Sequence, residues 1–158
     1  MAAGHVPSTP PPPRPLQLHR HDDGGLRRTA RSPVRAVFEH VGRPASGGVT
    51  WLWARADLDS ATVAAARREL SLLVGPGHNR GNVLVYLGPE CFVDLRGLRL
   101  LVDTARRVRL RGGALAVVSP PRCLRRMVRL DGSNAELPLV STARQATWWA
   151  RTRGTGIL

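Results

Sequence analysis

The chain has 158 residues, 42% of them apolar, which is enough for one domain with a real core plus an appendage. Its formal net charge is +13, but all 24 basic residues are arginine, a bias that we attribute to a GC-rich genome. The arginines are spread along the chain, and aromatic residues make up only 4%, too few for stacking on bases. No run approaches the ~20 apolar residues of a membrane span. We therefore expect neither nucleic acid nor a membrane as partner.

The two cysteines, Cys91 and Cys123, have neither CxxC nor zinc spacing, so we expect a reduced, cytoplasmic protein. The N-terminus carries no apolar segment of the kind that signal peptides contain. Cys91 lies in an apolar stretch, which favours a small buried side chain over a reactive thiol. We also find no set of residues with metal-ligand spacing, and we expect no metal and no cofactor.

Residues 1–33 are rich in proline and arginine and have no hydrophobic periodicity. Such a segment cannot bury enough apolar surface to offset the entropy of ordering, so we expect a disordered N-terminal tail. The run Pro10–Pro13 leaves a polyproline II docking motif open as an alternative to a flexible leader. Residues 151–158 are predicted to be a flexible C-terminal tail, so the folded domain should span residues 34–150.

Two strands are predicted at the start of this domain. Residues 34–41 alternate loosely, residues 42–48 supply a turn, and residues 49–56 alternate with Trp51 and Trp53 on one face. The two strands should form an antiparallel hairpin. The tryptophans could be a ligand platform, but two aromatic residues at a spacing of two more commonly belong to one packed face.

Two aspartates follow the second strand. Asp59 or Ser60 can cap a helix predicted over residues 61–74, whose apolar residues recur at spacings of three and four. Asp57 and Asp59 could also form a metal pair, but no third or fourth oxygen ligand lies nearby in sequence. Helix capping and loop hydrogen bonds are therefore the better interpretation of both carboxylates.

The next stretch predicts a strand, a tight loop and an amphipathic helix in direct succession. Residues 83–87 are almost wholly apolar, as in a strand covered on both faces. The helix is expected over residues 98–110 and to end at a glycine pair, Gly112-Gly113. On its surface, Asp103 and Arg107 have the i,i+4 spacing of an ion pair.

The loop Asp94–Gly97 consequently lies at the start of a predicted helix. Backbone N–H groups are unpaired at a helix start, and the helix dipole is positive there. Such a loop suits a phosphate, an acidic partner or a side chain that can be phosphorylated.

The same alternation of strand and helix continues to the end of the domain. A strand is predicted over residues 114–118, a helix over 122–130, a short extended piece over 137–140 and a last helix over 143–150. The helix over 122–130 carries arginines on its outer face, which we interpret as a solvated face rather than a surface for an anionic partner. Strands alternating with helices imply one α/β domain, a mixed sheet of four to five strands packed with about four helices.

Three motifs resemble one family. Residues 56–62, Ala-Asp-Leu-Asp-Ser-Ala-Thr, resemble the Gly-Glu-Leu-Asp-x-Ala-Thr start of the STAS domain, the fold of bacterial anti-sigma factor antagonists. Residues 83–98 resemble, without a gap, its strand and loop pattern Val-Val-Leu-Asp-Leu-Ser-x-Val-x-Phe-Ile-Asp-Ser-Ser-Gly-Leu. Residues 111–115 and Pro120-Pro121 match the downstream pieces, so the resemblance extends over residues 49–140.

The resemblance implies a mechanism. In the family, the unphosphorylated antagonist binds an anti-sigma factor that is also a serine kinase, and phosphorylation of the first serine after the loop aspartate breaks the complex. Here that position is Leu95 and the following serine is Arg96, so this switch cannot operate in the loop. Tyr86 replaces the usual strand aspartate, and we expect this replacement to change the support of the loop.

We therefore predict a regulatory protein-binding module that is not an enzyme. Its implied partner is an anti-sigma factor or serine kinase-like protein. The predicted partner-binding residues are Asp57, Asp59, Ser60, Asp94, Leu95, Arg96, Gly97 and Arg99, with Leu95 as a degenerate phosphosite. One alternative is a non-catalytic STAS subunit of a larger assembly in lipid transport or stress signalling. The other is a weak nucleotide binder, for which the chain offers no Gly-rich phosphate loop.

Overall fold

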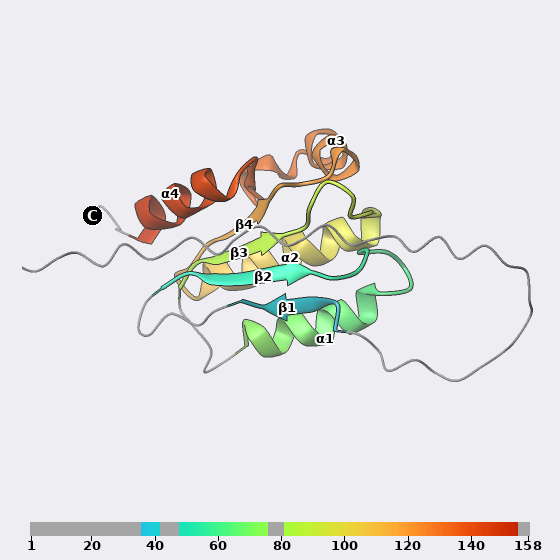
Figure 1. The fold of residues 1–158 in the computed structure, drawn as a ribbon, viewed down its shortest axis with the longest axis horizontal. Coiled ribbons are helices and arrows are strands. Elements are labelled where there is room, and N and C mark those ends of the chain that lie inside the picture. Colours follow the sequence, from blue (N-terminus) through green and yellow to red (C-terminus); the bar gives the residue numbers. More distant parts are fainter. Residues whose placement is uncertain (1–35, 42–47, 76–80, 155–158) are drawn as a thin grey trace, which may run out of the picture. The chain divides into compact units, whose positions relative to one another are not determined.

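The computed structural model describes residues 36–41, 48–75 and 81–154. The predicted N-terminal tail, the first residues of the first predicted strand, the turn over 42–47 and residues 155–158 lie outside the described residues. Within the described part, the chain forms a five-stranded sheet and four α-helices (Figure 1). This confirms the predicted α/β class.

The sheet keeps its strands in sequence order from one edge to the other. The strands are β1 Phe38–His40, β2 Thr50–Ala54, β3 Val83–Tyr86, β4 Leu115–Val118 and β5 Leu139–Val140. β1 pairs antiparallel with β2, whereas each later strand runs parallel to its neighbour. The mixed sheet and its initial hairpin are therefore as predicted. The parallel part requires a helical crossover between successive strands, which the amphipathic segments supply.

The helices follow the predicted order, and their boundaries differ most from the prediction in the second and the last helix. They are α1 Val63–Leu73, α2 Leu95–Leu110, α3 Arg122–Asp131, the short 3-10 helix η1 Ser133–Ala135, and α4 Ala143–Gly154. α2 begins three residues earlier than predicted. α4 continues four residues beyond its predicted end, so residues 151–154 are helical although the sequence pattern suggested a flexible tail.

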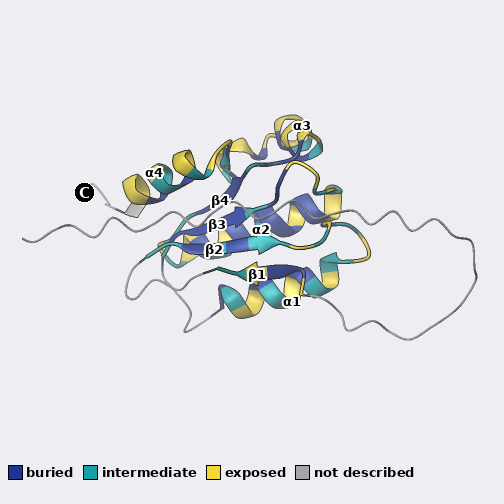
Figure 2. Cartoon of the chain, in the orientation of Figure 1, coloured by how far each residue is buried: buried dark blue, intermediate teal, exposed yellow. Residues whose placement is uncertain are grey.

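The sheet has an apolar core on each face, because alternate residues of its central strands point in opposite directions. Val83, Val85 and Val117 pack with α1, α2 and α3 in the larger core. Leu84 and Ala116 face the other way and pack against Ala146 and Ala150 of α4. Figure 2 shows the buried strands between these helices. β3 and β4 are therefore covered on both faces, which explains why their sequences are apolar throughout.

The predicted tryptophan face is a packed face. Trp51 packs against the smaller of the two cores, the one between the sheet and α4. The Trp53 ring lies 6.2 Å from the ring of Tyr86, with an angle of 52° between their planes, and Arg55 lies 5.6 Å from the Trp53 ring centre. Tyr86 thus contributes to the sheet face under α4, where it also packs against the smaller core.

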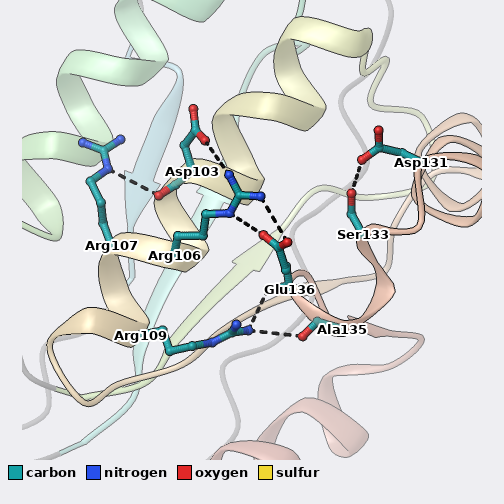
Figure 3. A network of polar contacts seen from close by, with 8 residues as sticks. All are labelled: Asp103, Arg106, Arg107, Arg109, Asp131, Ser133, Ala135 and Glu136. Atoms are coloured by element: carbon teal, nitrogen blue, oxygen red, sulfur yellow. Dashed lines mark hydrogen bonds and ion pairs between the residues drawn. The ribbon is translucent and has the colours of Figure 1, made fainter.

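The polar surface of α2 is bonded to η1 and to the residue that follows it, Glu136. Arg106 bonds to Glu136 through two nitrogens and lies 3.8 Å from the carboxylate of Asp103 (Figure 3). The Arg107 side chain donates instead to the backbone oxygen of Asp103, at 3.4 Å. The predicted Asp103–Arg107 ion pair is therefore wrong. The bond from Arg106 lowers the pKa of Glu136.

Candidate functional site

The segment before α1 and the segment before α2 are joined by backbone hydrogen bonds. The N–H of Leu58 donates to the oxygen of Phe92 at 2.8 Å, and the N–H of Asp94 donates to the oxygen of Leu58 at 3.0 Å. Leu58 and Val93 thereby form an isolated parallel bridge. The carboxylate of Asp57 accepts from the N–H of Phe92 at 2.8 Å. The two predicted site segments are thus brought together, and Asp57 helps to hold them.

Asp94 starts α2. Its backbone is extended, and its carboxylate accepts a hydrogen bond from the N–H of Gly97 at 2.9 Å. This satisfies one of the N–H groups that a helix start leaves unpaired. Because the cap lies at Asp94, the predicted loop Asp94–Gly97 is in fact the cap and first turn of the helix, which corrects its assignment as a loop.

Gly97 allows the helix to approach the segment before α1. A Cβ atom at this position would overlap the backbone oxygen of Leu58 and would lie 2.8 Å from the Cβ of Leu58. Gly97 and Leu58 are both buried. Gly97 therefore has a structural part in the site, and its surroundings leave no room for any side chain.

Apolar and basic side chains are exposed around this helix start. Phe92 is 53% exposed and Leu95 is 48% exposed, and Arg96 and Arg99 are also exposed. Neither arginine takes part in an ion pair with another described residue. We call the exposed side chains of Phe92, Leu95, Arg96 and Arg99 the helix-start surface.

Phe92 was not among the predicted site residues. The sequence contains no local signal for it, because its exposure follows from the burial of Val93 in the larger core. In the extended segment before α2, adjacent side chains point in opposite directions, so a buried Val93 turns Phe92 outward.

Asp59 and Ser60 lie in the turn that leads into α1. The carboxylate of Asp59 accepts from the N–H groups of Ala61 and Thr62, at 2.9 and 3.1 Å. Asp59 thus stabilises the turn before α1 and is not the cap of the helix, because the residue directly before α1 is Thr62, which makes no side-chain cap bond. The prediction that Asp59 or Ser60 caps the helix is therefore wrong. Ser60 is exposed and keeps its place among the predicted contact residues.

Replacing Asp94 with alanine should lower the free energy of unfolding by about 1 kcal/mol, because the N–H of Gly97 loses its cap. Asp94→Asn keeps an acceptor oxygen at the same position and should cost only a few tenths of a kcal/mol. Urea unfolding followed by circular dichroism measures both changes. An equal loss in the two variants would contradict the capping role and would assign the effect to charge.

Cys91 lies beside the site but is not a reactive group. Its side chain packs against the larger core, and its thiol approaches the backbone oxygens of Ala56 and Phe92, both at 3.7 Å. Burial, reinforced by the negative charge of Asp57, raises the pKa of Cys91 to about 12. The thiol consequently stays protonated near neutral pH and is a poor nucleophile, in agreement with the predicted packing role.

The described residues contain no cluster of side chains that could bind a metal ion. Nowhere in the described ranges do three His, Cys, Asp or Glu side chains gather as they would around an ion. Asp57 and Asp59, the predicted alternative for a metal pair, both bind backbone N–H groups. In the same part of the chain, no helix has the length and apolar character that crossing a membrane requires.

These features define a small α/β domain in which the start of one helix is held against a neighbouring turn and exposes a mixed apolar and basic surface. The model of the STAS domain family matches residues 43–146. The chain belongs to this family. A search of curated protein sequences found no match.

Several solved structures share the fold of this domain. TM1081 has a TM-score of 0.59 at 16% identity, covering 82% of this chain and 98% of its own. A crystal structure of the same protein, TM1081 from Thermotoga maritima, is described as that of an anti-sigma factor antagonist. Its TM-score is 0.59 at 18% identity, and the match covers 72% of this chain and 94% of that one. The anti-sigma factor antagonist SpoIIAA in its unphosphorylated form gives 0.54 at 19% identity, covering 77% and 98%. At these identities the likeness establishes the fold.

Proposed function

We propose that this chain is a non-enzymatic, cytoplasmic regulatory module that binds another protein through the helix-start surface, without phosphorylation at the usual loop position. The observation that carries the proposal is the half-exposed Leu95 at the position of the family's phosphoacceptor, three residues after the similarly exposed Phe92. Two exposed apolar side chains at one helix start suit a protein contact better than solvent.

The charges around this apolar pair indicate the chemistry of the partner. Arg96 and Arg99 are exposed beside the positive end of the α2 dipole. A complementary surface would place carboxylates around an apolar centre. By resemblance to the family, we assign the partner as an anti-sigma factor of the serine-kinase type, and Asp57, Asp59 and Ser60 as the neighbouring edge of the contact.

Partner binding could still be controlled by phosphorylation of a hydroxyl other than one at position 95. Thr104 is fully buried, and its hydroxyl donates to the backbone oxygen of Leu100 at 2.7 Å, so a kinase cannot reach it in the folded domain. Ser60 is exposed in the turn before α1. If a partner kinase modifies this domain, we expect phosphate at Ser60, which peptide mass spectrometry after incubation with ATP would locate.

Leu95→Asp should weaken binding to a serine-kinase-type anti-sigma factor from the same organism at least tenfold, about 1.4 kcal/mol. The change places a charge in an apolar contact, as the family's phosphate would. A carboxylate in the first helical turn interacts favourably with the dipole, so the domain should remain folded. Isothermal titration calorimetry measures the affinity, and thermal unfolding verifies the fold.

Leu110→Asp is the matched control, because Leu110 is 86% exposed on the same helix at its other end. This variant should bind like the unchanged protein. Equal binding by the Leu95→Asp variant would contradict the proposed surface. Leu95→Ser tests the lost switch, since it should accept phosphate from the kinase if the partner still docks in the family's orientation.

A second candidate is a non-catalytic domain of a larger assembly. The murine anion transporter Slc26a9 contains a similar fold, with a TM-score of 0.56 at 15% identity, over 18% of that chain and 67% of this one. A STAS fold can therefore be one part of a larger protein. Stable co-purification with a transport ATPase, unaffected by Leu95→Asp, would favour this alternative.

A further inference from the structure

A cavity of about 240 Å³ lies at the end of the domain opposite to the helix-start surface. Asn82 and Gly113 line it where β3 and β4 begin, and Arg109 lines it from the last turns of α2. Trp149 and Arg153 line it from α4. The 16 residues of α2 separate the two ends by about 24 Å, so the cavity and the helix-start surface are separate sites.

The lining has the chemistry of an anion site. It includes two guanidinium groups and no acidic side chain. Among the ion pairs of the described residues, none includes Arg109 or Arg153. Arg109 donates through one nitrogen to the backbone oxygens of Ala135 and Glu136, at 3.2 and 3.3 Å (Figure 3). A guanidinium has five N–H donors, and these bonds leave others available.

The arrangement also supplies an apolar wall. The guanidinium of Arg153 lies 5.8 Å from the ring centre of Trp149, one helical turn earlier in α4. Trp149 is partly buried and packs against the smaller core, so its ring is held in place. An indole beside two arginines can contact the planar body of a ligand while the guanidinium groups bind its oxyanion.

A buried amide holds the walls of the cavity together. Asn82 is 8% exposed; its side chain donates to the backbone oxygen of Ala150 at 2.8 Å and accepts from the N–H of Ala114 at 3.0 Å. These bonds fix the end of α4 relative to the starts of β3 and β4. A site whose walls are fixed before binding loses less conformational entropy when the ligand enters.

We propose that this cavity binds a small planar organic phosphate, with Arg109 and Arg153 on the phosphate and Trp149 against the planar part. The volume of about 240 Å³ lies below the ~300–1,000 Å³ of pockets for drug-sized ligands, which suits a small ligand. The inference is independent of the proposed partner, because it uses none of the residues of the helix-start surface.

Phenyl phosphate is the probe for this proposal, and two-dimensional ¹H–¹⁵N NMR is the measurement. We expect a saturable shift of the Trp149 indole signal at millimolar probe, assigned with Trp149→Phe, and weaker binding of inorganic phosphate. Arg153→Gln and Arg109→Gln should each weaken phenyl phosphate binding about tenfold, the loss of a charged hydrogen bond. Arg126→Gln, the same charge change on the exposed face of α3, should leave the affinity unchanged.

Three results would overturn the proposal. The first is no saturable shift at millimolar phenyl phosphate. The second is an equal loss in the Arg126→Gln variant, which would mean that the total charge attracts the probe. The third is unchanged binding in the Arg153→Gln variant. This variant keeps the contacts of Arg109 with η1, so its result can be interpreted even if Arg109→Gln disturbs the fold. Unchanged binding of phenyl phosphate in the Leu95→Asp variant would show that this site is independent of the helix-start surface.

Discussion

Gly97→Ala is expected to lower the free energy of unfolding by about 2–3 kcal/mol, the upper part of the range for an overpacked interior. The added methyl group would overlap the backbone oxygen of Leu58 and lie 2.8 Å from its Cβ. Neither atom belongs to the flexible end of a side chain, so the helix and the segment before α1 would have to separate. Alanine is a better helix former than glycine by roughly 0.5–1 kcal/mol, which offsets only part of this cost.

Urea unfolding and amide hydrogen exchange test this prediction together. The stability should fall, and the N–H groups of Leu58 and Asp94, which form the bridge between the two segments, should exchange faster than those of the central strands. Gly112→Ala is the control, because Gly112 has φ +82° and no heavy atom within 4 Å of an added Cβ. It should cost only the ~1–2 kcal/mol of a left-handed backbone. A smaller loss for Gly97→Ala than for Gly112→Ala would contradict the close approach.

Leu58→Ala should lower the free energy of unfolding by about 3 kcal/mol, within the ~2–5 kcal/mol measured for buried leucines. The Leu58 side chain is fully buried in the larger core, next to the helix start. Its loss leaves a cavity beneath the site while the backbone bridge to Val93 remains chemically intact. The free energy of unfolding should therefore fall, while the N–H of Asp94 should keep most of its protection from hydrogen exchange.

Leu72→Ala is the matched control for this variant. Leu72 is 71% exposed on α1, and the same truncation there should change the stability by no more than ~0.5 kcal/mol. Differential scanning calorimetry or urea unfolding of the pair gives the comparison. A similar small effect in both variants would mean that Leu58 is less tightly packed than its burial implies.

The extent of α2 illustrates how far local sequence could locate the site. The sequence predicts a helix start at Asp94–Gly97 but begins the helix itself at residue 98, three residues too late. The cap bond from the N–H of Gly97 to Asp94 satisfies the first turn in spite of the poor helix propensity of glycine. The same glycine is needed for contact with Leu58, a residue 39 positions earlier in the chain, and no local pattern contains that information.

Arg106 illustrates a contact that local spacing could not identify. The i,i+4 rule favoured Arg107 as the partner of Asp103, but Glu136, 30 residues beyond Arg106, binds Arg106. Arg106 then lies between Asp103 and Glu136 (Figure 3). Asp103 therefore pairs within the helix at i,i+3, with the arginine that Glu136 holds, and not at i,i+4. An exposed pair on one helix contributes only a few tenths of a kcal/mol, so a bond to a neighbouring segment is enough to decide between the two spacings.

Sequence patterns were enough to predict the order of strands and helices and the family, and they show that position 95 has no hydroxyl. These follow from side-chain chemistry and from apolar periodicity, which are local properties of the chain. Three features became visible only in the folded domain: the exposure of Phe92, the close approach of Gly97 to Leu58, and the extension of α4 that completes a cavity with two arginines. The physical reason is that each of these depends on packing between segments far apart in sequence, where burial and steric fit override local propensity.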